Sequence, residues 1–167
     1  TFVVRRGDPN QKVEEAKPGF VQVLVRTEDE TRWRKPAPAL DRRNLAEWLC
    51  DVDSGAGNLL ARVIVNRLWY YHTGRGLVAT PSDFGFQAEP PSHPELLDYL
   101  AGELVRGGWR LKPIHRLIMT SAVYMQTTAT DAARTKVDPD NRFCWHRSLR
   151  RLEAELVRDA IMAASGT

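Results

Sequence analysis

The sequence predicts a mainly α fold: a helical domain of four to five helices with a long structured loop and a small N-terminal β-containing arm. Two observations carry this prediction. Apolar residues recur at helical spacing in several segments after residue 40, and the stretch Gly74–Asp98, rich in glycine and proline, separates two of them. Valines near the N-terminus instead alternate with other residues, as in a strand. We expect an arm over residues 1–38 and a helical domain over residues 39–167.

Size and composition are those of one soluble globular domain. The chain has 167 residues and a formal net charge of +3, with 24 basic and 21 acidic residues that nearly balance. It has no run of about 18 apolar residues, and its first residues do not resemble a signal peptide. Its basic residues are mostly arginine, which suits ion pairs better than a solvated phosphate-tracking face. We expect a fragment of a larger protein, and we predict no membrane span in it and no nucleic acid as partner.

The N-terminal arm is predicted from two strand-like segments. Phe2–Arg6 and Phe20–Thr27 both favour strands, and the sequence RRGDPN between them is a turn signal. Residues 28–38 are charged and contain proline, so they predict a surface connector. Trp33 is its single large anchor.

Two helices are predicted before the long loop. Asp41 is placed to cap a helix that ends near Asp51, and Asn58 is placed to cap a longer one that Gly74 ends. The turn between them begins with the Asp51-x-Asp53 pair, but it lacks the glycine and the later glutamate of a calcium loop.

The remaining helices follow the loop. Ser92 to Glu95 has the form of a capping box, in which Ser92 accepts from the amide of Glu95 while Glu95 reaches back to Ser92. Pro113 opens the next helix, and the polar stretch Thr127–Asn141 is expected to be a surface connection. A last helix begins near Arg150, with an Arg151–Glu155 pair one helical turn apart. Its residues expected to point inward are Leu152, Leu156, Ala160, Ile161 and Ala164.

The candidate binding residues are Asn66, Arg67 and Arg75. Asn66 and Arg67 interrupt an otherwise apolar helix, and a polar group in such a position must find partners. They are expected to bind carbonyls and carboxylates of the Gly74–Asp98 loop and so pin it to the helix. Direct contact with a ligand is the alternative.

The candidate catalytic residues are Asp83, His93 and Glu95, which lie in or beside the loop. With Ser82 and Asp98 they allow a Ser-His-Asp or an Asp-Glu arrangement to be imagined, although no Gly-x-Ser-x-Gly elbow is present. Each has a structural explanation as well: Asp83 suits a turn, Glu95 a capping box and His93 an exposed first helical turn.

Metal and cysteine chemistry have little local support. No two of the four histidines are spaced as His-x-x-x-His, so no metal site is predicted. Cys50 and Cys144 form no Cys-x-x-Cys pair, which excludes a local zinc knuckle and covalent haem attachment in this fragment. A disulfide between them and two free thiols both remain open.

The motifs of this chain are those of a known family. They are the segment from Asn66 to Gln126, the later DPDNR and RRLEAELVRDAIMAASG, and the earlier RGDP and DRRNLAEWL. Together they resemble the planctomycete-specific domain of unknown function found C-terminal to planctomycete cytochrome c-like domains. The resemblance covers residues 5 to 166.

The resemblance implies a location and a set of partners. It implies a large protein in the periplasm or outside the cell, whose other domains carry haem, while no cofactor is expected in this fragment. With no complete catalytic signature, the sequence favours a non-catalytic scaffold or interaction domain of a cytochrome c-associated protein. Its partners are expected to be other domains of the same polypeptide, and other proteins. A hydrolase or other enzyme with its site at the 74–98 loop is the first alternative, and nucleic-acid binding is the second.

Overall fold

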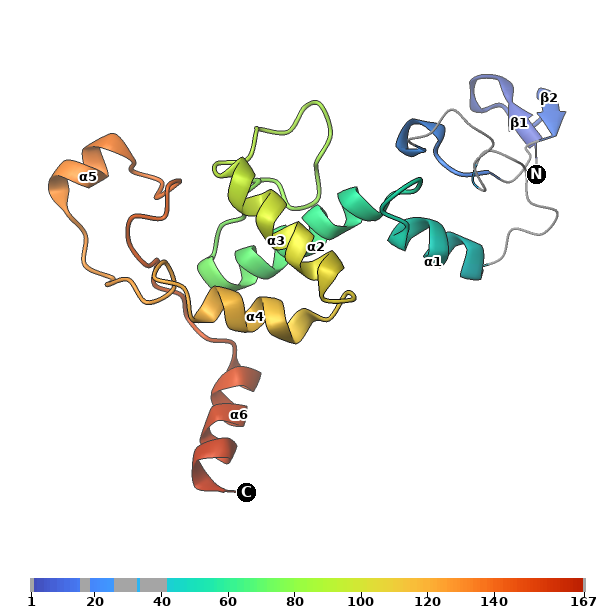
Figure 1. The fold of residues 1–167 in the computed structure, drawn as a ribbon. Coiled ribbons are helices and arrows are strands. Elements are labelled where there is room, and N and C mark those ends of the chain that lie inside the picture. The colour runs from blue at the N-terminus through green and yellow to red at the C-terminus, as the bar shows by residue number, and fades with distance from the viewer. Residues whose placement is uncertain (1, 16–18, 26–32, 34–41, 167) are drawn as a thin grey trace. The chain divides into compact units, whose positions relative to one another are not determined.

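The structure is a computed structural model that describes residues 2–15, 19–25, 33 and 42–166. These residues form six α-helices and a two-stranded antiparallel sheet near the N-terminus (Figure 1). The mainly α fold with a small β-containing arm is therefore confirmed. The chain forms two compact units, Thr1–Arg62 and Val63–Thr167. The boundary predicted between residues 38 and 39 lies outside the described residues.

The sheet of the first unit pairs β1 (Phe2–Val4) with β2 (Lys12–Glu15). Phe2 lies opposite Glu15 and Val3 opposite Glu14, and the register shifts before Val4. The second strand predicted from sequence is wrong for residues 22–24, which form a 3-10 turn, η2 (Gln22–Leu24). There the alternation of valines marks neither a strand nor one buried side, since only Val25 is buried while Val21 and Val23 are exposed.

The core of the first unit is an aromatic cluster. Trp33 is buried, as its role as the anchor of the connector predicted, and it packs with Trp48, Val25 and Ala56. The ring of Phe20 lies edge-on to Trp33, with ring centroids 5.0 Å apart, and stacks on Trp48 at 5.3 Å. The rest of the predicted connector lies outside the described residues.

Helix α1 (Arg42–Cys50) ends at a turn that is organised by Asp51. The predicted cap, Asp41, lies outside the described residues. The Asp51 carboxylate accepts hydrogen bonds from Trp33 Nε1 (2.6 Å), the Ser54 hydroxyl (2.7 Å) and the backbone amides of Asp53 and Ser54. Burial opposes ionisation, but these hydrogen bonds outweigh it and lower the pKa of Asp51 to about 2. The carboxylate therefore closes a turn rather than a calcium site.

Helix α2 (Gly57–Thr73) runs up to the long loop. It begins one residue before Asn58, the predicted cap, whose side-chain amide donates to the carbonyl of Val52 instead. It ends at Gly74, which adopts a φ of 90° and donates its amide to Tyr70. This is the left-handed conformation predicted for a residue that ends a helix.

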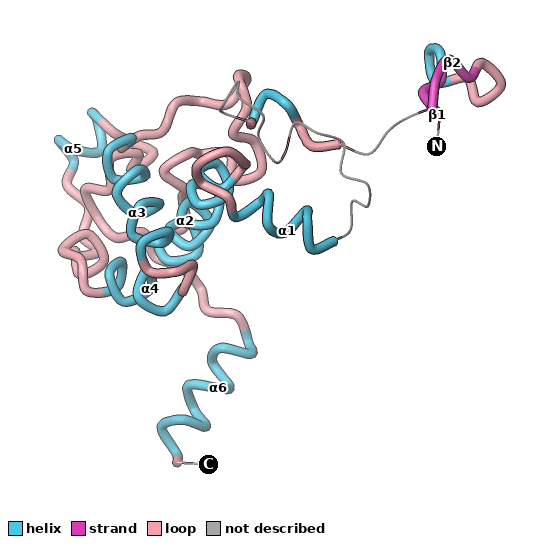
Figure 2. The backbone as a smooth tube through the Cα atoms, turned by 45° about the vertical axis from the view of Figure 1, so that its right-hand side comes forward, coloured by secondary structure: helices cyan, strands magenta, loops and turns pink. Residues whose placement is uncertain are grey.

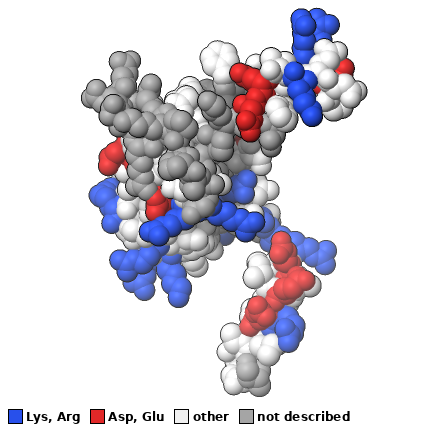
Figure 3. All heavy atoms as spheres, turned by 90° about the vertical axis from the view of Figure 1, so that its right-hand side faces the viewer, with Lys and Arg blue, Asp and Glu red and all other residues white. Residues whose placement is uncertain are grey.

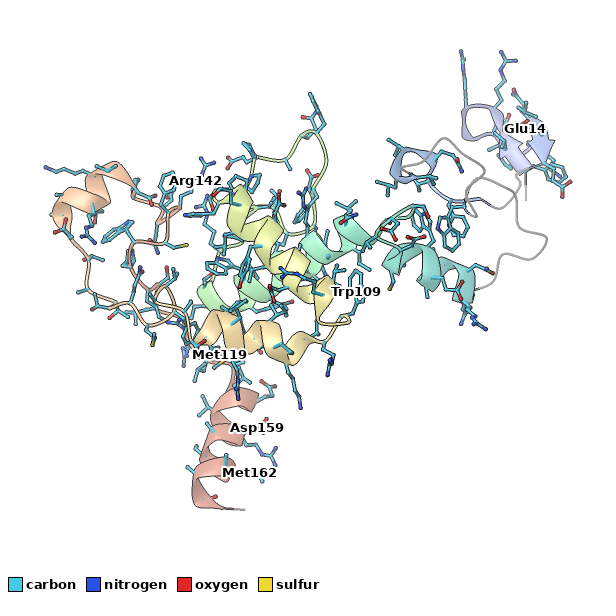
Figure 4. All side chains as sticks on the ribbon, viewed as in Figure 1. Glu14, Trp109, Met119, Arg142, Asp159 and Met162 are labelled. Atoms are coloured by element: carbon cyan, nitrogen blue, oxygen red, sulfur yellow. The ribbon has the colours of Figure 1, made fainter. Side chains whose placement is uncertain are left out.

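The core of the second unit lies among α2, α3 (Pro94–Arg106) and α4 (Leu111–Met119). Figures 1 and 2 show these three helices side by side. Trp109, labelled in Figure 4, lies in the short link between α3 and α4, where it follows Gly107 and Gly108 and adopts a φ of 61°. The buried apolar residues that these helices contribute within the second unit are Val65, Trp69, Leu97, Leu100, Ala101, Leu104, Ile114 and Ile118, and the long loop adds Leu77 and Val78.

The C-terminal part of this unit differs from its prediction in two ways. The stretch expected to be a surface connection contains a short helix, α5 (Ala132–Val137), because the Asp131 carboxylate caps it by accepting from the Arg134 amide. The last helix, α6 (Ala154–Ser165), begins four residues later than expected.

The apolar side of α6 was predicted to point inward, and this is wrong. Of that set, Leu152, Leu156 and Ile161 are 60%, 52% and 63% exposed, and Ala160 and Ala164 are exposed too. Figures 1 and 2 show α6 extending away from α2–α4. The helical spacing of apolar residues predicts an amphipathic helix, but it does not predict whether another part of the chain packs against the apolar side. Across the described parts of the chain, no helix is both long and apolar enough to span a bilayer.

Candidate functional site

The long loop is held to α2 by one buried side chain. Asn66 is fully buried. Its side-chain amide hydrogen-bonds to both backbone groups of Val78: the oxygen accepts from the Val78 N–H (2.9 Å) and the nitrogen donates to the Val78 carbonyl (3.1 Å). Gly76 leaves room for this contact, because a Cβ there would lie 2.9 Å from both amide atoms of Asn66. Further along, the Ser92 amide donates to the Leu77 carbonyl (2.8 Å) and closes the loop. The pinning role predicted for Asn66 is confirmed.

The other two predicted binding residues behave differently. Arg67 is exposed, and it makes no hydrogen bond or ion pair with any described residue. Its predicted pinning role is wrong, because one residue turns the helix by about 100° and carries Arg67 away from the loop. Arg75 is half-buried and donates to the Asp140 carbonyl at 3.5 Å. It joins the start of the loop to the segment after α5.

Asp83 shapes a turn within the loop. Its carboxylate accepts from the Gly85 amide (2.8 Å), and its backbone carbonyl accepts from the Thr80 hydroxyl (2.9 Å). Its own amide donates to the Thr80 carbonyl. These contacts are those of an Asx turn.

The capping box predicted before α3 does not form. The helix begins at Pro94 with His93 as its cap residue, one position later than expected, and no side chain caps it. Ser92 cannot take the predicted place, because its amide is bonded to Leu77 and its hydroxyl lies 3.0 Å from His93 Nδ1. Glu95 is exposed in the first turn, where a carboxylate favours the positive end of the helix.

No catalytic arrangement joins the three predicted catalytic residues. The His93 imidazole meets Ser92 and the edge of the Phe143 ring, at 6.0 Å between centroids. No hydrogen bond links His93 to Asp83 or Glu95, and none of the three lines the pocket beside His72. Asp83 and His93 thus have structural contacts.

A polar turn after α5 is built on the DPDN sequence. The buried Asp138 carboxylate accepts from the amides of Arg142 and Phe143, both at 2.8 Å. Asn141, at a φ of 51°, bonds the backbone of Trp145 and His146 through its side-chain amide. Arg142 marks this segment in Figure 4. The turn directs the chain back towards the end of α2 and places Arg147 there.

A second cluster, which we call the His72 cluster, comprises His72, His115, Tyr124 and Arg147. His72 Nε2 lies 2.8 Å from His115 Nδ1, so one ring donates a proton to the other. The Arg147 guanidinium stacks 3.7 Å from the centre of the Tyr124 ring and donates to the carbonyl of Tyr124 (3.1 Å). It also reaches the His72 carbonyl at 3.5 Å. The cluster joins the end of α2, α4 and the two segments that flank α5.

The electrostatics of the His72 cluster favour a neutral imidazole. Burial lowers the pKa of His72 first, and the neighbouring His115 and the positive charge of Arg147 lower it further. Close by, burial raises the pKa of the Cys144 thiol, Asp138 adds to the rise, and Arg75 opposes it. Both cysteines are free thiols in the structure.

The His72 cluster was not predicted as a site. Its two histidines are 43 residues apart in the chain, and Arg147 lies 75 residues from His72. No local spacing links them, and only the packing of α4 beside α2 brings the two rings together. Within the described ranges, no group of three or more histidine, cysteine, aspartate or glutamate side chains is arranged to hold a metal ion.

The comparisons with known proteins give a family and no further relatives. No curated protein and no solved structure matches the chain. One family model matches residues 41–167, which is most of the chain and includes every helix from α1 to α6. The chain therefore belongs to the family described as PSD1, a protein of unknown function (DUF1553).

Proposed function

We propose that this chain is a non-catalytic interaction module, and that α6 carries its contact with another domain of the same polypeptide. The observation that carries the proposal is the exposed apolar side of α6. Leu156, Val157 and Ile161 recur at helical spacing, and they are 52%, 43% and 63% exposed. Such a contiguous apolar surface is typical of a site of association.

The chemistry of α6 favours a protein surface over a lipid surface. Its polar side carries Glu155, Arg158 and Asp159, and Figure 3 shows acidic and basic side chains next to each other along this helix. Helices that lie on membranes carry mostly lysine and arginine on their polar side. Mixed charges instead suit the polar rim of a protein interface.

Energetics also favour a docked α6. A helix of 12 residues is marginally stable in water without tertiary contacts. Burying what remains exposed of its three large apolar side chains contributes about 1 kcal/mol each, half of the value for full burial. Docking would therefore stabilise α6 by about 3 kcal/mol.

The resemblance supplies the partner and the location in this proposal. Other domains of the same polypeptide, some of them carrying haem, are the partners that it implies, in the periplasm or outside the cell. The loop residues support a non-catalytic role because the Asp83 carboxylate closes a turn and the His93 imidazole contacts the Ser92 hydroxyl. The enzyme alternative predicts a turnover of the full-length protein that Asp83→Ala or Glu95→Ala abolishes without unfolding it.

Hydrogen exchange tests the docking of α6. We expect the amides of residues 157–165 to exchange fast in the isolated chain and at least tenfold more slowly in the full-length protein. Ile161→Glu should restore fast exchange. Met162→Glu is the matched control, because Met162 lies with Asp159 on the opposite side of the helix (Figure 4). Equal exchange rates in the two proteins would refute the proposal, whereas protection that depends on chain concentration would assign the surface to a second copy.

A further inference from the structure

A cavity beside the His72 cluster has the size and the lining of a small-molecule site. It lies between the end of α2 and residues 147–156, and its volume is about 530 Å³. Ligand pockets typically have volumes of about 300–1,000 Å³. Its wall includes three arginines, Arg147, Arg150 and Arg151, and one acidic residue, Glu153. The cavity is therefore lined by two net positive charges.

The arginines have no carboxylate partners among the described residues. Arg147 donates to the carbonyls of Tyr124 and His72, and Arg150 donates to the carbonyl of Tyr71 (2.7 Å). Arg151 makes no hydrogen bond or ion pair with any described residue. Carbonyl groups hold a guanidinium in place but leave its positive charge uncompensated. Arg147 and Arg150 are thus held in place, and the wall with Arg151 remains cationic.

The wall also includes the neutral imidazole of His72. It lines the cavity, and its Nε2 already faces His115. Burial lowers the pKa of His72 first, and the neighbouring His115 and the positive charge of Arg147 lower it further. An anion in the cavity would offset the positive charge of the three arginines.

The cavity also has apolar lining residues. Leu149, Leu152 and Leu156 are among them and are more than half exposed, and the rings of Tyr71 and Tyr124 add aromatic surface. A bare inorganic anion leaves these side chains in contact with water. A ligand with an oxyanion at one end and an apolar body at the other matches both kinds of lining residue.

We propose that this cavity binds a small organic anion, with its carboxylate or phosphate on Arg147, Arg150 and Arg151 and its apolar body against the leucines. Arginine suits both heads, because its planar fork bonds two oxygens at once. Leu156 also belongs to the α6 surface proposed for docking, so the two proposals are tested separately: titration of the chain alone reports anion binding, and hydrogen exchange in the full-length protein reports docking.

Calorimetric titration of the folded chain tests the proposal with four probes. Phenyl phosphate and benzoate carry the same ring with the two different heads, inorganic phosphate lacks the ring, and benzyl alcohol lacks the charge. We expect at least one aromatic anion to bind, and to bind at least fivefold more tightly than inorganic phosphate or benzyl alcohol. Whichever of phenyl phosphate and benzoate binds more tightly shows whether the site prefers a phosphate or a carboxylate. Absence of binding of both aromatic anions at 10 mM, or equal binding of all probes, overturns the proposal.

Two variants locate the site. Arg151→Gln should weaken binding of the aromatic anion about tenfold, the loss of one charge-assisted hydrogen bond. The fold of the Arg151→Gln variant should persist, because Arg151 makes no hydrogen bond or ion pair with any described residue. Arg158→Gln removes the same charge from α6 outside the cavity, and its affinity should match that of the unmodified chain. Ligand-induced shifts of the imidazole signals of His72 should accompany binding. Equal affinities of the two variants, or shifts that spare His72, would place the anion elsewhere.

Discussion

Removing the side-chain amide of Asn66 is expected to be among the most destabilising single changes in the second unit. Asn66→Ala leaves the N–H and the C=O of Val78 without partners, and Val78 is 3% exposed. An unsatisfied buried polar group costs about 1–3 kcal/mol, so two cost about 2–6 kcal/mol. Water that enters the space of the lost amide can bond one of them. We therefore expect a loss of about 2–4 kcal/mol in the free energy of unfolding.

Urea denaturation followed by circular dichroism measures this loss, and amide hydrogen exchange at Val78 locates it. Arg67→Ala is the matched control: it lies on the next residue of the same helix, is exposed, and should change stability by less than about 0.5 kcal/mol. If Asn66→Ala were as mild as Arg67→Ala, the loop would not be held as we infer.

Asn66→Asp separates hydrogen bonding from packing, because the two side chains have nearly the same shape. A carboxylate still accepts from the Val78 amide, but its second oxygen then faces the Val78 carbonyl, and the charge is buried. Protonation at low pH restores a donor for that carbonyl. The difference in stability between this variant and the unmodified chain should therefore shrink as the pH falls from 7 to 4. A difference independent of pH would contradict the geometry.

Three further predictions concern other residues. Gly76→Ala should destabilise the second unit by about 1–3 kcal/mol, because the added Cβ collides with the Val78 carbonyl and the Asn66 amide, and the melting temperature reports it. Trp33→Phe removes a hydrogen bond that the Asp51 carboxylate accepts. Because the pKa of Asp51 is lowered in the folded state, its ionised carboxylate stabilises the fold above pH 3.8, and this stabilisation is lost as the pH falls through about 2. The variant should raise the pKa of Asp51 in an NMR titration and cost about 1 kcal/mol at pH 7, allowing for solvent exposure. The pKa of His72 is lowered below 6.5 in the folded state. The free energy of unfolding should therefore be constant above pH 6.5 with respect to this residue and should fall as the pH drops below 6.5. His72→Gln should make this fall smaller.

Each of these has an outcome that contradicts it. A neutral Gly76→Ala would mean that the loop has room that the structure lacks. An Asp51 that titrates near pH 3.8 in the unmodified chain would remove the basis of the second prediction. The third prediction fails if the unmodified chain and His72→Gln have the same dependence of stability on pH between 7 and 5.

Much of the fold was predictable because it depends on local physics. The helical periods of α2, α3 and α4, the left-handed glycine after α2 and the buried anchor Trp33 were all predicted and are all present. The pinning role of Asn66 was also predictable, since a buried amide must be satisfied wherever the chain folds.

The wrong predictions share a physical cause: each depends on which other residue a side chain or backbone group contacts in the folded chain. Ser92 has the chemistry of a cap, but its amide is bonded to Leu77, so the capping box does not form. Arg67 has the chemistry of a loop anchor, but the rotation of the helix directs it to solvent. The third case is the valines of residues 21–25: their alternation favours a strand, but this segment forms a 3-10 turn and only Val25 of the three is buried.

The candidate site shows where local reasoning ends. The sequence by itself determined the amphipathic helices, their approximate ends and the need to satisfy Asn66, because these follow from interactions within a few residues or from burial alone. Only the tertiary structure decided that His72 meets His115, that Arg147 stacks on Tyr124, and that the apolar side of α6 stays uncovered. Those contacts depend on how elements far apart in the chain pack, and residue spacing carries no information about that packing.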